Sequence, residues 1–300
     1  RAVAGTGSAG LSGDGGLATQ AQLYYPSGLA LDDAGNVLYI ADEYNHRVRA
    51  VNLASGIIST LAGNGTAANP STGDGGPALS AGLYYPLQLA QRGGKLYVAE
   101  NGQKIRVVDL TAATPTIGTA LQDSQVCTGA VQFRGCTSSY ACGLAVDASG
   151  ALYASAYLCG ASPGGSAYGI VRWDGTTLTH VAGRIQSGST DNEGTPAQNI
   201  YLSEPPGLSF GPGGRLFLAD MGGDVIRFLD QLDTAPRNRR WFGAGTQGFA
   251  GNYASVVTDP FAIQLYNPTQ VVFTPAGDAV ITDYQNQTVR LVYGAASVLP

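Results

Sequence analysis

The sequence predicts an all-β protein assembled from repeated four-stranded units. Three observations support this: the glycine content, a repeat of about sixty residues, and short apolar runs without helical periodicity. The 300-residue chain contains 43 glycines, which indicates many tight turns between short strands. Leu-Tyr-Tyr-Pro at 23–26 returns at 83–86, and Gly-Asp-Gly-Gly at 13–16 returns at 73–76. Each unit therefore begins with the same loop and strand entry.

Within the first copy, four short apolar runs alternate with clusters of Asp, Asn and Gly, which are typical turn residues. The predicted strands are Ser27–Leu31, Val37–Ala41, Arg47–Val51 and Ile57–Ala62. Four antiparallel strands without an intervening helix are the unit of a β-propeller blade. One blade cannot bury both of its faces, so neighbouring blades are expected to stack on each other.

Five copies of this unit are visible, and they predict a single propeller domain over residues 1–300. Residues 2–7 resemble residues 60–65 at the end of the first copy, so we expect the N-terminal strand to complete the last blade and close the ring. This predicts five blades, or six if another set of strands lies outside the segment. Because the chain starts at Arg1 without a methionine, we interpret it as a processed chain or as one segment of a larger protein.

An arginine follows an aliphatic residue in every copy, at Arg49, Arg106, Arg172, Arg227 and Arg290. In four copies an acid precedes the arginine by six or seven positions, so that the charges can meet across a strand pair. Recurrence in several copies indicates a structural role, because a catalytic site would need one special copy. The predicted structural ion pairs are Asp42–Arg49, Glu100–Arg106, Asp220–Arg227 and Asp283–Arg290.

The motifs at residues 13–18, 26–32, 35–42 and 45–49 together resemble the NHL repeat. The resemblance covers essentially the whole chain, closely in the first two copies and loosely in the others. It implies an NHL-type β-propeller, a fold that usually has six blades in this family. Family members act mostly as scaffolds for protein contacts. Some bind RNA through a basic face, and a distant group are metal-dependent lyases.

Charge and hydropathy exclude two classes of partner. The net charge is −5, and only Lys95 and Lys104 are lysines, so the broad basic face of a nucleic-acid-binding protein is missing. The one basic cluster, at residues 237–240, is expected in a solvated hairpin turn. No run of eighteen apolar residues exists, so we expect no membrane insertion.

Cysteines and sequons favour a secretory route, and hence an extracellular or cell-surface location. Cys142 and Cys159 flank strands expected to end side by side, which predicts a Cys142–Cys159 disulfide and leaves Cys127–Cys136 as the second. The spacings do not match a zinc pattern. Asn64 and Asn286 begin intact N-glycosylation sequons, so N-linked glycans are expected.

Tyrosines mark a candidate partner-binding rim. Tyr24, Tyr25, Tyr84 and Tyr85 precede the first strands of two copies, and Tyr44 and His46 lie in a link expected on the same rim. Tyrosine is favoured at interfaces. The alternative, which we favour slightly from sequence, is that the tyrosine pairs pack under the long loops.

Metal and cofactor chemistry has little support, and we predict no cofactor. His46 and His180 are the only histidines, so a three-histidine zinc site is impossible, and His46 is expected to form a hydrogen bond in its turn. Asp14 and Asp74 raise the possibility of calcium, but their flanking glycines favour a turn in which the aspartate bonds its own backbone.

The sequence therefore predicts an extracellular module that binds proteins, such as copies of itself or other domains of a larger chain. Two alternatives stay open: a propeller enzyme, lyase or hydrolase, with a metal in its channel, and a glycan-binding module. Catalysis is the less favoured reading, because no catalytic motif is present.

Overall fold

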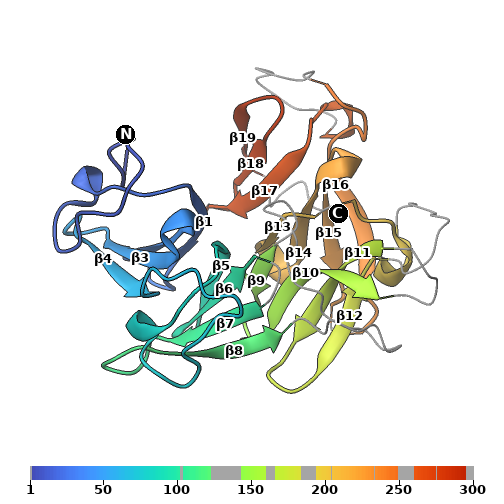
Figure 1. Cartoon of the computed structure of the whole chain (residues 1–300). Helices are drawn as coiled ribbons and strands as arrows, with labels where there is room; N and C mark the ends of the chain where they lie inside the picture. The colour runs from blue at the N-terminus through green and yellow to red at the C-terminus, as the bar shows by residue number, and fades with distance from the viewer. Residues whose placement is uncertain are drawn as a thin grey trace. The chain divides into compact units, whose positions relative to one another are not determined.

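The computed structural model describes residues 2–101, 104–122, 143–159, 166–183, 194–203, 205–232, 234–248, 260–274 and 276–294, without the side chains of residues 157–159 and 166–167. Residues group into two compact units (Figure 1). The first comprises Arg1–Asp123 and Gly135–Ser139, and the second Ser124–Arg134 and Tyr140–Pro300. Each unit is described by itself.

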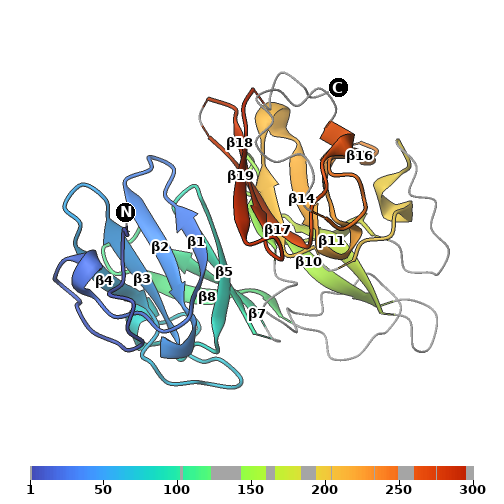
Figure 2. The same cartoon turned by 90° about the horizontal axis from the view of Figure 1, so that it is seen from above.

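The first unit contains two four-stranded antiparallel sheets, each in sequential order (Figure 2). One sheet consists of β1 (Pro26–Leu31), β2 (Val37–Asp42), β3 (Arg47–Asn52) and β4 (Ile58–Ala62), and the other of β5 (Pro86–Arg92), β6 (Lys95–Glu100), β7 (Lys104–Asp109) and β8 (Thr116–Gln122). The strands predicted for the first copy therefore agree with the structure to within one residue at each end.

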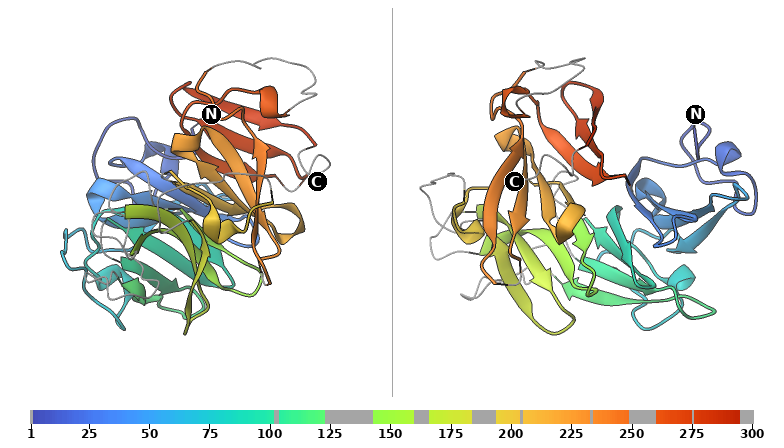
Figure 3. Two further views of the ribbon diagram at one scale, coloured as in Figure 1. Left: turned by 90° about the vertical axis from the view of Figure 1, so that its right-hand side faces the viewer. Right: turned by 180° about the vertical axis from the view of Figure 1, so that it is seen from behind.

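The second unit contains three further antiparallel sheets, in yellow-green, orange and red in Figure 3. They consist of β9 (Leu144–Val146), β10 (Leu152–Cys159), β11 (Ser166–Trp173) and β12 (Leu178–Ala182); β13 (Gly207–Phe210), β14 (Leu216–Asp220), β15 (Val225–Asp230) and β16 (Arg237–Phe242); and β17 (Pro268–Phe273), β18 (Ala279–Asp283) and β19 (Thr288–Val292). The last sheet has three strands among the described residues. Closure by the N-terminal strand and the single-domain organisation stay predictions.

The hydrophobic core lies between neighbouring sheets of each unit. In the first unit, Tyr39 and Val48 of one sheet share a cluster with Leu96 and Val98 of the next. In the second, Tyr153 and Ile170 pack with Leu208 and Leu216, and Phe217 and Phe228 pack with Val271 and Ile281. This is the stacking expected of propeller blades, whose apolar faces are buried only by their neighbours.

Loops between the sheets complete these cores with short 3₁₀ turns. The turns are η1 (Ala18–Gln20), η3 (Ala78–Ser80), η4 (Ala197–Asn199) and η7 (Pro260–Ala262). Ala78 and the following Ala81 are fully buried between the first two sheets. Small residues at these positions let the loop lie close to the sheets, which explains why alanine recurs after Gly-Asp-Gly-Gly. All helices in the described part of the chain are such short turns, and none could cross a membrane.

Glycine in the Pro-Ser-Gly-Leu stretch has a packing role. A Cβ atom added to Gly28 of β1 would lie 2.5 Å from the carbonyl oxygen of Leu87 and 2.6 Å from the Cα of Gln88, both in β5. The Ser27 hydroxyl donates to the same Leu87 carbonyl over 2.9 Å. The first strands of the two sheets therefore approach each other closely, and only glycine fits.

In the second unit one arginine departs from the repeat, and one expectation was wrong. In β11 the arginine is displaced: Arg49 pairs with Ile40, but Val171 pairs with Ala154, the residue equivalent to Ile40. Arg172 therefore points to the opposite face, because successive residues of a strand alternate. The basic cluster is not in a turn either. Arg237, Arg239 and Arg240 lie in β16, where the extended chain pairs with β15.

Candidate functional site

Buried acid–arginine pairs form the framework of the site. Asp42 and Arg49 are both fully buried, and Nη1 of Arg49 lies 3.2 Å from Oδ2 of Asp42. All four pairs expected from the sequence meet in this way. The closest oxygen–nitrogen distances of the other three are 3.9 Å for Glu100–Arg106, 2.8 Å for Asp220–Arg227 and 2.7 Å for Asp283–Arg290.

Aspartates of the Gly-Asp-Gly-Gly loops form a second layer of this framework. Asp14 Oδ1 lies 2.6 Å from Arg49 Nη2, and Asp74 Oδ1 lies 2.5 Å from Arg106 Nη2. The other carboxylate oxygen of Asp14 accepts the Thr60 hydroxyl. Partial burial acts to raise the pKa of Asp14, but the hydrogen bonds of Thr60 and Arg49 and the charge of Arg49 outweigh it, so the pKa lies below its usual value.

The expectation that these aspartates bond their own backbone was therefore wrong. Their carboxylates bind the arginine of the blade that the loop crosses. The sequence signal was available, because the loop and the arginine recur together in the first two copies. Among the described residues, no group of three or more His, Cys, Asp or Glu side chains could hold a metal ion. The calcium hypothesis stays untested.

The buried acids also hold the chain in front of the first strands. Asp42 Oδ1 accepts the backbone N–H of Tyr24 over 2.7 Å, and Glu100 Oε1 accepts that of Tyr84 over 2.9 Å. Asp283 does the same for Tyr266 over 2.8 Å. These bonds connect the interior framework to the tyrosines and fix the position of their backbone.

Five tyrosines and one histidine of the first unit form one continuous surface group, which we call the tyrosine cluster: Tyr24, Tyr25, Tyr44, Tyr84, Tyr85 and His46. The ring of Tyr44, in the η2 turn (Glu43–Asn45) between β2 and β3, lies 5.2 Å from Tyr24, 4.8 Å from Tyr25 and 5.3 Å from Tyr85. Tyr85 in turn contacts Tyr84 at 4.9 Å and His46 at 4.4 Å. Residues that the sequence only placed on a common rim are thus in direct contact.

Three rings of the tyrosine cluster face solvent. Tyr25 is 66% exposed, Tyr44 44% and Tyr24 37%, whereas Tyr84 and Tyr85 are half-buried. The expectation that the tyrosine pairs pack under the long loops is wrong for Tyr24 and Tyr25. The half-buried Tyr85 ring contacts the exposed Tyr44 ring and links it to Tyr84.

The backbone at two tyrosines adopts an unfavourable conformation. Tyr25 has φ +50° and Tyr85 φ +44°, in the left-handed region that Asn and Gly adopt with the least strain. The equivalent position before β17 carries Asn267, with φ +52°. The chain itself therefore shows that asparagine meets the backbone requirement, so the tyrosine ring at 25 is not needed for the turn.

Neighbouring groups set the protonation of the tyrosine cluster. Loss of hydration lowers the pKa of His46, with a smaller contribution from the charge of Arg47, so the imidazole stays neutral at physiological pH. Its Nδ1 accepts the backbone N–H of Tyr85 over 3.2 Å, the turn hydrogen bond expected for this histidine. Loss of hydration and the Glu43 charge raise the pKa of Tyr44. The cluster thus presents neutral aromatic rings.

The remaining predicted residues lie apart from the tyrosine cluster or outside the described part of the chain. Cys127, Cys136 and Cys142, and the Cys159 side chain, fall outside it, so both disulfides stay predictions. Asn64 is exposed. The Nδ2 atom of Asn286, to which a glycan would attach, donates to Gly248 O and Asp283 Oδ2 over 2.7 and 2.9 Å. His180 lies in the outer strand β12.

Comparison with known proteins finds the same kind of repeat that the sequence resembles. The model of the NHL repeat matches residues 23–50, which contain four members of the tyrosine cluster. NHL repeat-containing protein 2 of Bos taurus is 34% identical over 105 residues, and that of Homo sapiens 34% over 98 residues. These alignments cover 34% and 32% of this chain, but only 14% and 13% of the relatives' length.

Two solved structures share the fold. One, titled as a nidogen/laminin complex, superposes with a TM-score of 0.52 and 18% identity over 89% of this chain and 74% of the other. The second is a luciferin-regenerating enzyme, with a TM-score of 0.51 and 11% identity over 89% and 71% of the two chains. At these identities the likeness shows the fold alone, and the five antiparallel sheets are the blades of a β-propeller.

Proposed function

Since this chain carries NHL repeats and its sheets are β-propeller blades, we propose that it is a protein-binding module that holds its partner on the tyrosine cluster. The observation that supports this most strongly is the exposure of Tyr24, Tyr25 and Tyr44 in one contiguous group. Tyrosine contributes large contact area with few rotatable bonds, and it is enriched among the residues that dominate binding energies.

Rigidity of the tyrosine cluster supports the same function. The backbone of Tyr24 is bound to buried Asp42, and the N–H of Tyr44 donates to the Tyr24 carbonyl over 3.1 Å. Rings that are ordered before binding lose little conformational entropy when the partner arrives. The left-handed backbone at Tyr25 adds to this argument, because strained positions concentrate at functional sites.

A cross-linking experiment tests the proposal. A photoreactive phenylalanine analogue at position 25 is expected to cross-link one protein reproducibly, and the same analogue at position 293 is not. Tyr293 is a suitable control because it is 77% exposed and lies in the second unit, outside the tyrosine cluster.

The cross-linked protein is then purified and its affinity measured by calorimetry. Tyr25→Asn with Tyr44→Ser is expected to weaken binding by about 30-fold or more, as for a hot spot worth about 2 kcal/mol. Tyr293→Asn should leave it unchanged. Equal affinity of both variants, while the cluster variant keeps its circular dichroism spectrum, would refute the proposal. If the cross-linked protein is the chain itself, the module assembles with its own copies.

We also propose that the module acts outside the cell, with a glycan on Asn64. Four cysteines within residues 127–159 and two sequons support a secretory route. Asn64 is the better acceptor because it is exposed and its Nδ2 atom donates one hydrogen bond, to Ser80 O over 3.1 Å, whereas a glycan on Asn286 would break two. A peptide N-glycosidase mass shift that disappears in Asn64→Gln supports this assignment, and secreted protein without any shift contradicts it.

A further inference from the structure

We propose that Tyr25 and Tyr44 are a site of oxidative modification, at which hydrogen peroxide and a haem peroxidase join the two rings into dityrosine. The ring centres lie 4.8 Å apart, the shortest distance between two tyrosine rings in the tyrosine cluster, and their planes are inclined by 40°. Tyr25 precedes β1, and Tyr44 lies in the η2 turn between β2 and β3. The link would therefore join two separate loops of the first blade. Coupling depends on the rings themselves and not on the partner proposed above.

Both rings are open to an oxidant. Tyr25 and Tyr44 are the two most exposed tyrosines of the tyrosine cluster. A peroxidase takes an electron from a phenol that reaches the edge of its haem, and the phenol proton passes to water. Contact with solvent therefore favours these two rings over the half-buried pair Tyr84 and Tyr85, whose centres lie 4.9 Å apart.

Coupling oxidises two phenols by one electron each. Each ring gives up one electron and one proton and becomes a phenoxyl radical, with unpaired density on the carbons ortho to the oxygen. Two ortho carbons form a C–C bond. Their C–H bonds then break, and the hydrogens return to the oxygens as the rings regain aromaticity. The electrons and protons given up reduce one hydrogen peroxide to two waters, so the protein loses two hydrogen atoms in total.

Backbone hydrogen bonds hold the two loops together before any oxidation. The N–H of Tyr44 donates to the Tyr24 carbonyl over 3.1 Å, and the Tyr24 N–H donates to buried Asp42, which ends β2. The exposed side chains rotate within nanoseconds, which lets the ortho carbons meet. A ring held nearby in this way has a higher effective concentration than a ring of another molecule in dilute solution. We therefore expect coupling within one chain.

Other pairs within the tyrosine cluster are less well arranged. The Tyr24 ring lies 5.2 Å from Tyr44 and 5.5 Å from Tyr25, and Tyr24 is less exposed than either. The half-buried Tyr85 ring lies 5.3 Å from Tyr44 and meets it at 79°, almost edge-on. Distance and exposure together therefore assign the link to Tyr25 and Tyr44.

Peptide mapping of the oxidised chain tests this inference. The 300-residue chain is treated at micromolar concentration with a haem peroxidase and hydrogen peroxide, and the monomer is isolated in denaturant. We expect dityrosine fluorescence and a mass lower by two hydrogen atoms. A protease that cleaves before aspartate separates the two tyrosines, because Asp32, Asp33 and Asp42 lie between them in sequence, so residues 14–31 should be joined to residues 42–73. A monomer without dityrosine, or dityrosine confined to cross-linked dimers, would overturn the proposal.

Substitutions by phenylalanine identify the pair, because they keep a ring but remove the phenol. Tyr25→Phe and Tyr44→Phe should each lower the dityrosine yield of the monomer by about tenfold or more, since the remaining rings are less favourably placed. Tyr84→Phe is the matched control: its ring belongs to the tyrosine cluster but contacts only Tyr85, so the yield should stay unchanged. Unchanged yield in both test variants, or a loss in Tyr24→Phe equal to that in Tyr25→Phe, would contradict the assigned pair.

Discussion

Replacing Asp42 by asparagine tests the buried framework beneath the tyrosine cluster. The fully buried carboxylate accepts three hydrogen bonds: from Tyr24 N over 2.7 Å, Asn45 Nδ2 over 2.8 Å and Arg49 Nη1 over 3.2 Å. An amide of the same shape keeps the bond to Tyr24. Its NH₂ group, however, then faces the donors of Asn45 and Arg49.

Asp14 limits the loss of stability in Asp42→Asn. Breaking a buried ion pair costs about 3–5 kcal/mol, because it leaves a charge without its partner. Arg49 retains Asp14 at 2.6 Å, so we expect the lower end of this range, about 3 kcal/mol. This is a large share of the ~5–15 kcal/mol that stabilises a typical domain.

Urea unfolding followed by far-ultraviolet circular dichroism measures this cost by linear extrapolation. Asp14→Asn is the matched control. It removes the other partner of the same arginine, but its side chain is 50% exposed, so we expect a loss of about 1 kcal/mol or less. If Asp42→Asn costs no more than Asp14→Asn, the buried pair is not what stabilises this blade.

Three further predictions concern charge, packing and backbone. Loss of hydration raises the pKa of Glu100 above 4.5. The wild type should therefore lose stability relative to Glu100→Gln as the pH rises from below 4.5 to neutral. Urea unfolding of both proteins at both pH values checks the sign, and an opposite slope would contradict it. Gly28→Ala should lower the free energy of unfolding, measured by thermal unfolding, by about 1–3 kcal/mol, because the new methyl group meets Leu87. Gly118→Ala, where the new methyl has no atom within 4 Å, should be nearly neutral. Similar losses of stability in both variants would show that the close approach of the strands is not the cause. Tyr25→Asn should change the free energy of unfolding by less than about 1 kcal/mol, since relief of the left-handed backbone offsets the lost ring contacts; a larger loss would give the ring a structural role.

The recurring sequence motifs predicted the blades well because strands and turns depend on local patterns. The turn clusters of the first copy fixed its four strands, and the acid–arginine spacing indicated which strands face each other. Asp42 and Arg49 are seven positions apart across a short link between paired strands, so the partners could be identified from sequence.

Prediction from the motifs failed where the motif is present but the strand register is shifted. Val171-Arg172 looks like the other aliphatic–arginine pairs, yet Val171 occupies the arginine position and is fully buried. The acid is replaced by Ala156, so this blade lacks both charges of the inner pair. A single-residue shift cannot be detected from spacing alone, since it depends on strand pairing.

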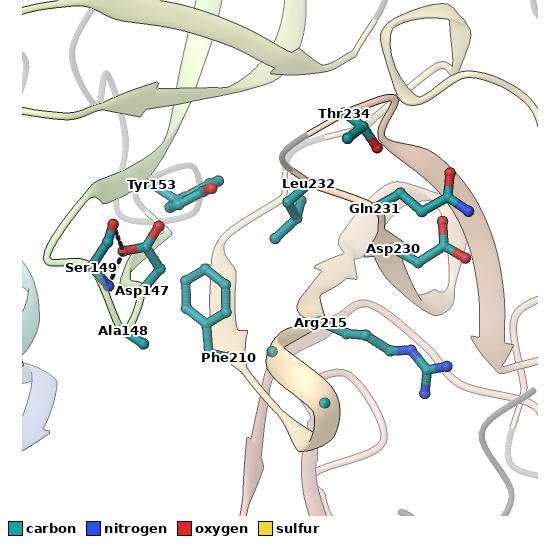
Figure 4. Close-up of a pocket in the computed structure, with 12 residues that line it drawn as sticks. Asp147, Ala148, Ser149, Tyr153, Phe210, Arg215, Asp230, Gln231, Leu232 and Thr234 are labelled. Carbon is teal, nitrogen blue, oxygen red and sulfur yellow. Dashed lines mark hydrogen bonds between the residues drawn. The ribbon is translucent and has the colours of Figure 1, made fainter.

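Tertiary contacts between loops were the second feature that the sequence could not predict. The sequence placed six aromatic residues on one rim but could not show that their rings touch. The joint recurrence of the Gly-Asp-Gly-Gly loop and the arginine could have suggested the Asp14–Arg49 contact, but it did not show which atoms meet. Nor did the sequence indicate that turns far apart along the chain lie together beside Phe210 (Figure 4). These features depend on which loops meet across neighbouring sheets.

The most direct test of the central claim is ¹⁹F NMR of the chain labelled with 3-fluorotyrosine, recorded while the cross-linked partner is added. The account predicts that the resonances of Tyr25 and Tyr44 shift or broaden in proportion to the bound fraction, and that Tyr293 stays unchanged. A saturated complex in which Tyr25 and Tyr44 keep their free-state resonances would contradict it.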